Sequence, residues 1–171
     1  MNKKLSKYLG VIIASSIIPA SIPASTSAQS SNVYYKIVAA HSNKCAQVND
    51  ASTSNGATIS QWDCVNQTNV QWSFVYAGKG YFYIKARHSG KCAQVDNGST
   101  SNGAAISQWD CVNQDNVKWS LVSVGNGYYF IKAKHSGKCA QVNDASKSNG
   151  VVISQWDCVD QNNVKWRLDP A

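Results

Sequence analysis

The sequence predicts an all-β protein in which one structural unit is repeated three times. Its six cysteines are separated by 19, 28, 19, 28 and 19 residues, so the repeat length is 19 + 28 = 47 residues. The segments around them alternate aromatic or β-branched residues with polar ones, and Gly- and Asn-rich turn sequences divide these segments. No segment of the repeats has the apolar spacing of a helix.

The three units align from a histidine four residues before the first cysteine of each pair. Each unit continues with Cys-Ala-Gln-Val and a polar stretch that ends in Ser-Asn-Gly. The sequences Ile-Ser-Gln-Trp-Asp-Cys-Val and Asn-Val-x-Trp follow in all three. The units span approximately residues 33–78, 79–125 and 126–171, and their similarity indicates one shared local fold.

The second unit shows the expected strands most clearly. Residues 81–86 are rich in aromatic residues. Apolar and polar residues alternate along residues 92–95, 105–109 and 118–122. Turn sequences separate these segments: Asn97-Gly98, Asn102-Gly103 and Gly125-Asn-Gly127. We therefore expect four short strands per unit. Helical solenoids do not fit this pattern, and propellers typically need four or more blades. Three units of four strands point to a β-trefoil.

The N-terminal segment lies outside the repeats. Three lysines precede an uncharged apolar stretch over residues 9–22, and the small residues 26–28 follow. This order is typical of a secretory signal peptide, and the apolar stretch is too short and too interrupted by proline for a membrane anchor. We expect a signal peptide over residues 1–28 and a secreted mature domain over 29–171. The signal resembles those of Gram-positive bacteria, so we expect a bacterial source. Export permits disulfides.

Charge and residue types restrict the function of the mature domain. It keeps 13 of the 16 Lys and Arg residues and all 9 acidic residues, which gives a net charge of 13 − 9 = +4. The positive charge is spread over the three units, so we expect neither a nucleic-acid stripe nor membrane insertion. Every acidic residue is Asp, and no unique pair of carboxylates or Ser-His-Asp set is present. We therefore expect no enzyme.

Four motifs of the second unit resemble those of the ricin B-type (R-type) lectins, also known as ricin-type carbohydrate-binding modules. They are Gly90-Lys-Cys-x-x-Val95, Ser101-Asn-Gly103, Ile106-Ser-Gln-Trp-Asp-Cys111 and Asn116-Val-Lys-Trp119, with matching stretches in the other units. The resemblance covers residues 33–169 and implies a β-trefoil with a disulfide inside each repeat. Six cysteines alone allow 15 connectivities. The implied pairs, which the spacing also favours, are Cys45–Cys64, Cys92–Cys111 and Cys139–Cys158.

The same resemblance implies a shallow sugar site in each repeat. The family uses a polar residue two positions after the first cysteine, an aromatic residue two before the second, and an Asn five after the second. An indole face packs on the C–H face of a pyranose, while amides bond its hydroxyls. The implied contacts need no metal and no cofactor. The nine residues are Gln47, Trp62, Asn69, Gln94, Trp109, Asn116, Gln141, Trp156 and Asn163.

Two positions depart from the family's usual pattern in all three units. Gln stands where Asp is usual, and a neutral amide forms weaker hydrogen bonds than a carboxylate, so the preferred sugar can differ. The Gln of the family's Gln-x-Trp signature is replaced by valine, which predicts a drier core with little effect on binding. These valines are Val70, Val117 and Val164.

The six tryptophans fall into two classes. Trp72, Trp119 and Trp166 alternate with polar neighbours, which predicts core packing. The other three lie out of phase with Ile59, Ile106 and Ile153. If the isoleucines point inward, these tryptophans point outward, and exposed Trp at three equivalent places indicates a binding platform. A structural role is the alternative.

The repeated polar residues have simpler expected roles. His41, His88 and His135 are expected in turns or on the surface, because no Cys-x-x-Cys spacing supports a metal site. Asp63, Asp110 and Asp157 are expected to make hydrogen bonds at strand ends. Asp50, Asp96 and Asp144 are expected to be solvated loop carboxylates, and Asp96, two residues after Gln94, is the one that could add an acceptor to a site.

These observations favour a secreted lectin that binds glycans or polysaccharides through up to three sites. A clustered glycan that engages several sites would bind about 10²–10⁴-fold more tightly than one site alone. The alternative is a protein-interaction trefoil, such as a protease inhibitor or the cell-binding component of a toxin. It would use the least repetitive segments, residues 76–79 and 123–126.

Overall fold

The structure is a computed structural model, and it describes residues 33–171. The predicted signal peptide, residues 1–28, lies outside the described residues. Within residues 33–171, no helix has the length and apolar character needed to cross a membrane.

Twelve strands and six short 3₁₀ helices make up the domain, which confirms the prediction of four strands per unit. The strands are β1 (Tyr35–Ala39), β2 (Cys45–Val48), β3 (Ile59–Trp62), β4 (Trp72–Gly78), β5 (Tyr81–Ala86), β6 (Cys92–Val95), β7 (Ile106–Trp109), β8 (Trp119–Ser123), β9 (Tyr128–Ala133), β10 (Cys139–Val142), β11 (Ile153–Trp156) and β12 (Trp166–Pro170). The 3₁₀ helices are η1 (Asn49–Ala51), η2 (Thr68–Val70), η3 (Asp96–Gly98), η4 (Asp115–Val117), η5 (Asn143–Ala145) and η6 (Asn162–Val164).

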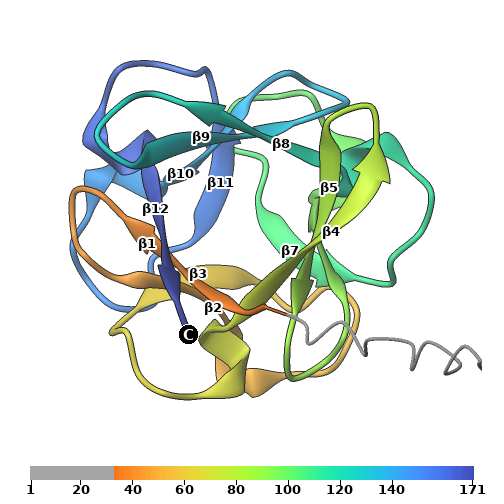
Figure 1. The fold of residues 1–171 in the computed structure, drawn as a ribbon, viewed down its shortest axis with the longest axis horizontal. Helices are drawn as coiled ribbons and strands as arrows, with labels where there is room; N and C mark the ends of the chain where they lie inside the picture. The colour runs from red at the N-terminus through yellow and green to blue at the C-terminus, as the bar shows by residue number, and fades with distance from the viewer. Residues whose placement is uncertain (1–32) are drawn as a thin grey trace, which may run out of the picture. The chain divides into compact units, whose positions relative to one another are not determined.

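Six of the strands close into an antiparallel barrel. β1 pairs with β4, β4 with β5, β5 with β8, β8 with β9, β9 with β12, and β12 returns to β1. Each unit thus supplies its first and last strand to the barrel (Figure 1). Because the ring is closed, none of these six strands is left as an open edge.

The remaining strands form three hairpins, β2–β3, β6–β7 and β10–β11, one in each unit. Isolated bridges join the hairpins to one another, as between Thr58 and Ser107, Ser60 and Val152, and Ala105 and Ser154. The barrel and these three mutually bridged hairpins, repeated around a pseudo-threefold axis, define the predicted β-trefoil (Figure 1).

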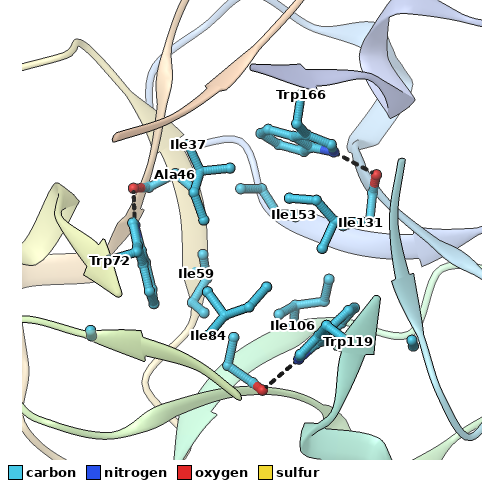
Figure 2. Packing of buried hydrophobic residues seen from close by; sticks show 14 of the residues in the cluster. Ile37, Ala46, Ile59, Trp72, Ile84, Ile106, Trp119, Ile131, Ile153 and Trp166 are labelled. Carbon is cyan, nitrogen blue, oxygen red and sulfur yellow. Dashed lines mark hydrogen bonds between the residues drawn. The ribbon is translucent and has the colours of Figure 1, made fainter. Parts of the chain in front are cut away.

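The core lies on this axis and has the same composition in each unit. Trp72, Trp119 and Trp166 are each 1% exposed, as predicted for these positions. Each indole Nε1 donates a hydrogen bond of 2.8–2.9 Å to the carbonyl oxygen of a buried alanine, so its polar atom is satisfied (Figure 2). Ile59, Ile106 and Ile153 surround the axis and are each 3% exposed.

The disulfides join the first and second cysteine of each unit, which confirms the predicted pairing. Their Cα atoms are 5.0, 5.1 and 5.1 Å apart. In the first unit, Val70 packs with Val38 and Cys45 in a small apolar cluster next to the main core. Val70, Val117 and Val164 are fully buried, so an apolar side chain fits where the family has Gln.

Candidate functional site: three hairpin faces

The register of each hairpin decides which side chains share a face. Cys45 pairs with Trp62 and Gln47 with Ser60, so these four side chains lie on one face of β2–β3. Ala46, Gln61, Val48 and Ile59 lie on the opposite face, towards the axis. The same register recurs in β6–β7 and β10–β11. The polar residue and the aromatic residue expected to bind sugar are therefore diagonal neighbours on adjacent strands, a relation that places Cα atoms about 7–8 Å apart.

The three tryptophans of these faces are the large aromatic side chains that the hairpins expose. Trp62, Trp109 and Trp156 are 39%, 40% and 41% exposed, in contrast to the buried isoleucines three residues earlier. This confirms the predicted difference in phase. About two fifths of each of these side chains is therefore accessible to solvent, and the rest packs against the protein.

The expected amide partners are close together but nearly buried. Asn69 is 4% exposed, and its Nδ2 donates to Gln47 Oε1 at 3.3 Å and to the carbonyl oxygen of Val48 at 3.0 Å. The same two bonds recur from Asn116 and from Asn163 in the other units. Asn thus holds Gln in place, and both side chains keep only part of their hydrogen-bonding capacity for a ligand.

A serine connects this pair to the following 3₁₀ turn. Ser154 Oγ accepts a hydrogen bond of 3.3 Å from Gln141 Nε2 and donates one of 2.5 Å to Asn143 Oδ1. In the second unit Ser107 donates to a carboxylate oxygen of Asp96. Asp96 is half-buried and hydrogen-bonded, so the expectation of a solvated loop carboxylate was wrong for this residue. The alternative, an additional acceptor for a ligand beside Gln94, stays a prediction.

Each site borders a loop of a different unit, which sequence inspection did not indicate. A Cβ on Gly150 of the third unit would lie 3.9 Å from the edge of the Trp62 ring, and one on Gly56 of the first unit 4.0 Å from Trp109. Gly150 N donates to the carbonyl oxygen of Gln61 at 2.8 Å. The Ser-Asn-Gly sequence present in every unit is the signal that could have located this contact.

Carboxylates beside the tryptophans reinforce the same border. Asp63 accepts hydrogen bonds from Lys44 Nζ at 2.5 Å and from Asn149 Nδ2 of the third unit at 2.8 Å. The bond from Lys44 is the main cause that lowers the pKa of the Asp63 carboxyl, and the bond from Asn149 is the second. Asp110 and Asp157 have equivalent partners and likewise a lowered pKa. The predicted strand-end hydrogen bonds are therefore confirmed and extend between units.

Two further repeated residues serve the junctions between units. Gln61 is fully buried, which its phase with Ile59 could have revealed. His41 Nε2 is 2.8 Å from the carbonyl oxygen of Ser146 in the third unit, and its buried Nδ1 has no hydrogen-bond partner among the described residues. His41 lies in a turn, as predicted, but it is half-buried at a junction and is not a free surface imidazole.

Metal binding has no structural support in the described domain. Within residues 33–171, no three or more His, Cys, Asp or Glu side chains are grouped to hold an ion. All six cysteines are in disulfides, and an oxidised cysteine is not a thiolate ligand. The groups that these faces contain are an indole ring, amides and a hydroxyl in each unit, with the Asp96 carboxylate in the second.

Fold and site together define a lectin-like β-trefoil domain. The chain belongs to the family of ricin-type beta-trefoil lectin domain-like proteins, whose pattern matches residues 24–109 and 115–171. No curated protein matches the chain in sequence.

Solved structures of similar proteins include a designed threefold symmetric protein, ThreeFoil. It is 44% identical with a TM-score of 0.80, and the match covers 81% of this chain and 99% of ThreeFoil. The exo-β-1,3-galactanase 1,3Gal43A from Clostridium thermocellum is 32% identical with a TM-score of 0.81, over 83% of this chain but 31% of the enzyme. A ricin B-like lectin from Macrolepiota procera, solved with lactose, shares the fold at 15% identity and a TM-score of 0.71, over 83% of this chain and 98% of the lectin.

Proposed function

We propose that this protein is a secreted carbohydrate-binding lectin with up to three shallow, metal-independent sites. The observation that carries the proposal is the half-exposed Trp of each hairpin face, next to a Gln that an Asn holds in place. Trp109 would stack on the C–H face of a sugar ring, and the remaining amide capacity of Gln94 and Asn116 would bond hydroxyls.

The relatives support a glycan as the ligand. The Macrolepiota procera lectin was solved with lactose and an earthworm R-type lectin with GalNAc. Both are under 25% identical to this chain, so the likeness concerns the fold. Which sugar this protein binds depends on the residues of its own sites. With Gln in place of the usual Asp, hydrogen bonds to hydroxyls are weaker at each site, which favours polymers or clustered glycans that engage more than one site.

No catalytic role is part of the proposal. The chain spans 31% of the length of the exo-β-1,3-galactanase that it resembles, as a lectin-like module would. Three disulfides fit an extracellular protein, and residues 1–28 would be the signal for export.

A glycan array and pull-down with insoluble polysaccharides test the function. The triple variant Trp62→Ala/Trp109→Ala/Trp156→Ala should lose binding and keep its fold, because these side chains are outside the core. Tyr76→Ala is the matched control, since Tyr76 is 66% exposed and lies on β4, outside the hairpin faces. Undiminished binding by the triple variant, or the absence of any bound glycan, would contradict the proposal.

One observation favours the alternative, a protein-interaction trefoil. Val75 and Tyr76 are 43% and 66% exposed near the turn of the β4–β5 hairpin, and Tyr76 packs edge-on against Phe82 with ring centroids 5.9 Å apart. Inhibition assays against common proteases and binding to host-cell proteins test this role. Loss of such activity in Tyr76→Ala, with the triple Trp variant unaffected, would favour it over the lectin.

A further inference from the structure

The three hairpin faces differ in the 3₁₀ turn that receives the serine hydroxyl, which reads Asn-Asp-Ala in the first and third units and Asp-Asn-Gly in the second. The first residue of the 3₁₀ turn is Asn49 in the first unit, Asp96 in the second and Asn143 in the third. In each unit this residue accepts the hydrogen bond of the serine opposite Gln: Ser60, Ser107 or Ser154. At this position the second unit therefore has a carboxylate, where the other two units have a neutral amide.

The carboxylate fixes the direction of the whole chain of hydrogen bonds in the second unit. An ionised Asp96 only accepts, so the single hydroxyl proton of Ser107 points to it. Ser107 Oγ then accepts from Gln94 Nε2 at 3.3 Å, and this orients Gln94 Oε1 towards Asn116 Nδ2, also at 3.3 Å. The direction of each hydrogen bond from Asn116 to Asp96 is therefore fixed.

The other two units do not have this constraint. Asn143 offers an oxygen on one side of its amide and an NH₂ group on the other, and a flip of the amide reverses what it presents to Ser154. The serine hydroxyl can then donate or accept, and the orientation of Gln141 is no longer imposed from that end. The amides of the first and third sites are accordingly less preorganised for a ligand.

Asp96 also changes what the site offers to a ligand. Its side chain is half-buried, and among residues 33–171 its second carboxylate oxygen has no hydrogen-bond or ion-pair partner. At Asn49 and Asn143, when the oxygen receives the serine, the group left over is an NH₂ donor. Hydrogen bonds to a charged acceptor are about twice as strong as neutral ones. Hydroxyl-rich glycans can supply the donor.

From these observations, and resting on the proposed lectin function, we infer that the second unit holds the tightest of the three glycan sites. Asp96 is its specificity-determining residue. It positions Gln94 through Ser107 and presents a free acceptor to a sugar hydroxyl. The first and third units hold weaker sites that add avidity.

The indole N–H signals of Trp62, Trp109 and Trp156 allow the three sites to be measured separately by NMR in one sample. We would titrate the protein with lactose, N-acetylgalactosamine and the strongest glycan on the array. The Trp109 signal should saturate at about five- to tenfold lower sugar concentration than the other two, as expected for one charged hydrogen bond in place of a neutral one.

Reciprocal substitutions identify the cause. Asp96→Asn should bring the Trp109 site to the affinity of the other two, and Asn143→Asp should raise the Trp156 site by a similar factor. Asp144→Asn is the control, because it removes a carboxylate from the same turn of the third unit at an exposed position that the serine does not contact. It should leave all three affinities unchanged.

The outcomes separate this inference from the proposed function. Equal affinities at the three indoles, or a Trp109 site unaffected by Asp96→Asn, would overturn the role of Asp96 and leave the lectin standing. A Trp156 site unaffected by Asn143→Asp would have the same meaning. No shift of any of the three indole signals with any sugar would overturn the lectin function and the inference together.

Discussion

Gln61 Nε2 donates a hydrogen bond of 2.7 Å to the carbonyl oxygen of Ser146, 85 residues further along the chain. A second bond of 2.8 Å reaches the carbonyl oxygen of Ser148, and Gln61 Oε1 accepts from Ser42 Oγ at 2.8 Å. The side chain is fully buried, and both its Nε2 and its Oε1 form hydrogen bonds. Gln108 and Gln155 make the corresponding bonds. The first unit thus binds the third, the second binds the first, and the third binds the second, so buried amides hold the ring of units closed.

Replacement of one such glutamine should destabilise the domain. Gln61→Ala removes three hydrogen bonds and leaves two buried carbonyl oxygens and the Ser42 hydroxyl without this partner. We expect a loss of about 2–4 kcal/mol in the free energy of unfolding, because unpaired buried polar groups keep their desolvation cost. Urea unfolding followed by Trp fluorescence measures it.

Gln67→Ala is the matched control, since Gln67 is exposed and its side chain caps no helix. Its free energy of unfolding should stay within about 0.5 kcal/mol of the wild type. Equal stability of the two variants would mean that the junction contributes nothing measurable.

Removal of one disulfide should lower the free energy of unfolding about as much as Gln61→Ala. The pair Cys139–Cys158 closes a loop with a sequence separation of 19, and Cys139 is fully buried. We expect Cys139→Ala/Cys158→Ala to lower the free energy of unfolding by about 3 kcal/mol, chiefly because the unfolded chain gains freedom. Denaturant unfolding measures the loss. Cys45→Ala/Cys64→Ala should lose a similar amount, and unequal losses would show that the units are not energetically equivalent.

The sequence was sufficient for the fold and for the exposed half of each site. A period of 47 residues with four alternating segments predicted the twelve strands, and the phase between Ile106 and Trp109 predicted which of the two faces solvent. Both are properties of one unit, and strand alternation depends on local backbone geometry.

Contacts between units could not be predicted in the same way. Three nearly identical units do not reveal whose Ser-Asn-Gly loop Trp62 will meet, because the answer depends on how the ring of hairpins closes. The role of Asp96 likewise required the register of β6–β7, which places Ser107, 11 residues away, beside it. Its repeat equivalents are Asn, and that difference was visible in the sequence.

The same substitution should destabilise the domain much more at Trp119 than at Trp109. Trp119→Ala opens a cavity in the core and leaves the Ala93 carbonyl oxygen unpaired, so we expect a loss of about 3–5 kcal/mol in the free energy of unfolding. Trp109→Ala should cost less than about 1 kcal/mol, because the ring is 40% exposed. Thermal and urea unfolding of the two variants measure the difference. A strongly destabilised Trp109→Ala would favour the structural role for the exposed tryptophans.

Acid should lower the stability of the three junctions between units, through Asp63, Asp110 and Asp157. The pKa of each of these carboxyls is lowered mainly by a hydrogen bond from a lysine and secondly by one from an Asn of another unit. A carboxyl with a folded-state pKa below its unfolded value stabilises the fold above the unfolded pKa of about 3.9, and this stabilisation is lost as pH falls through the lower folded value. We therefore expect the urea concentration at the midpoint of unfolding to decrease as the pH is lowered from about 5 to about 2. Substitution of all three residues by Asn should reduce that fall, whereas Asp144→Asn, at an exposed position, should not. An unchanged pH dependence in the triple variant would show that these carboxylates do not couple the junctions to pH.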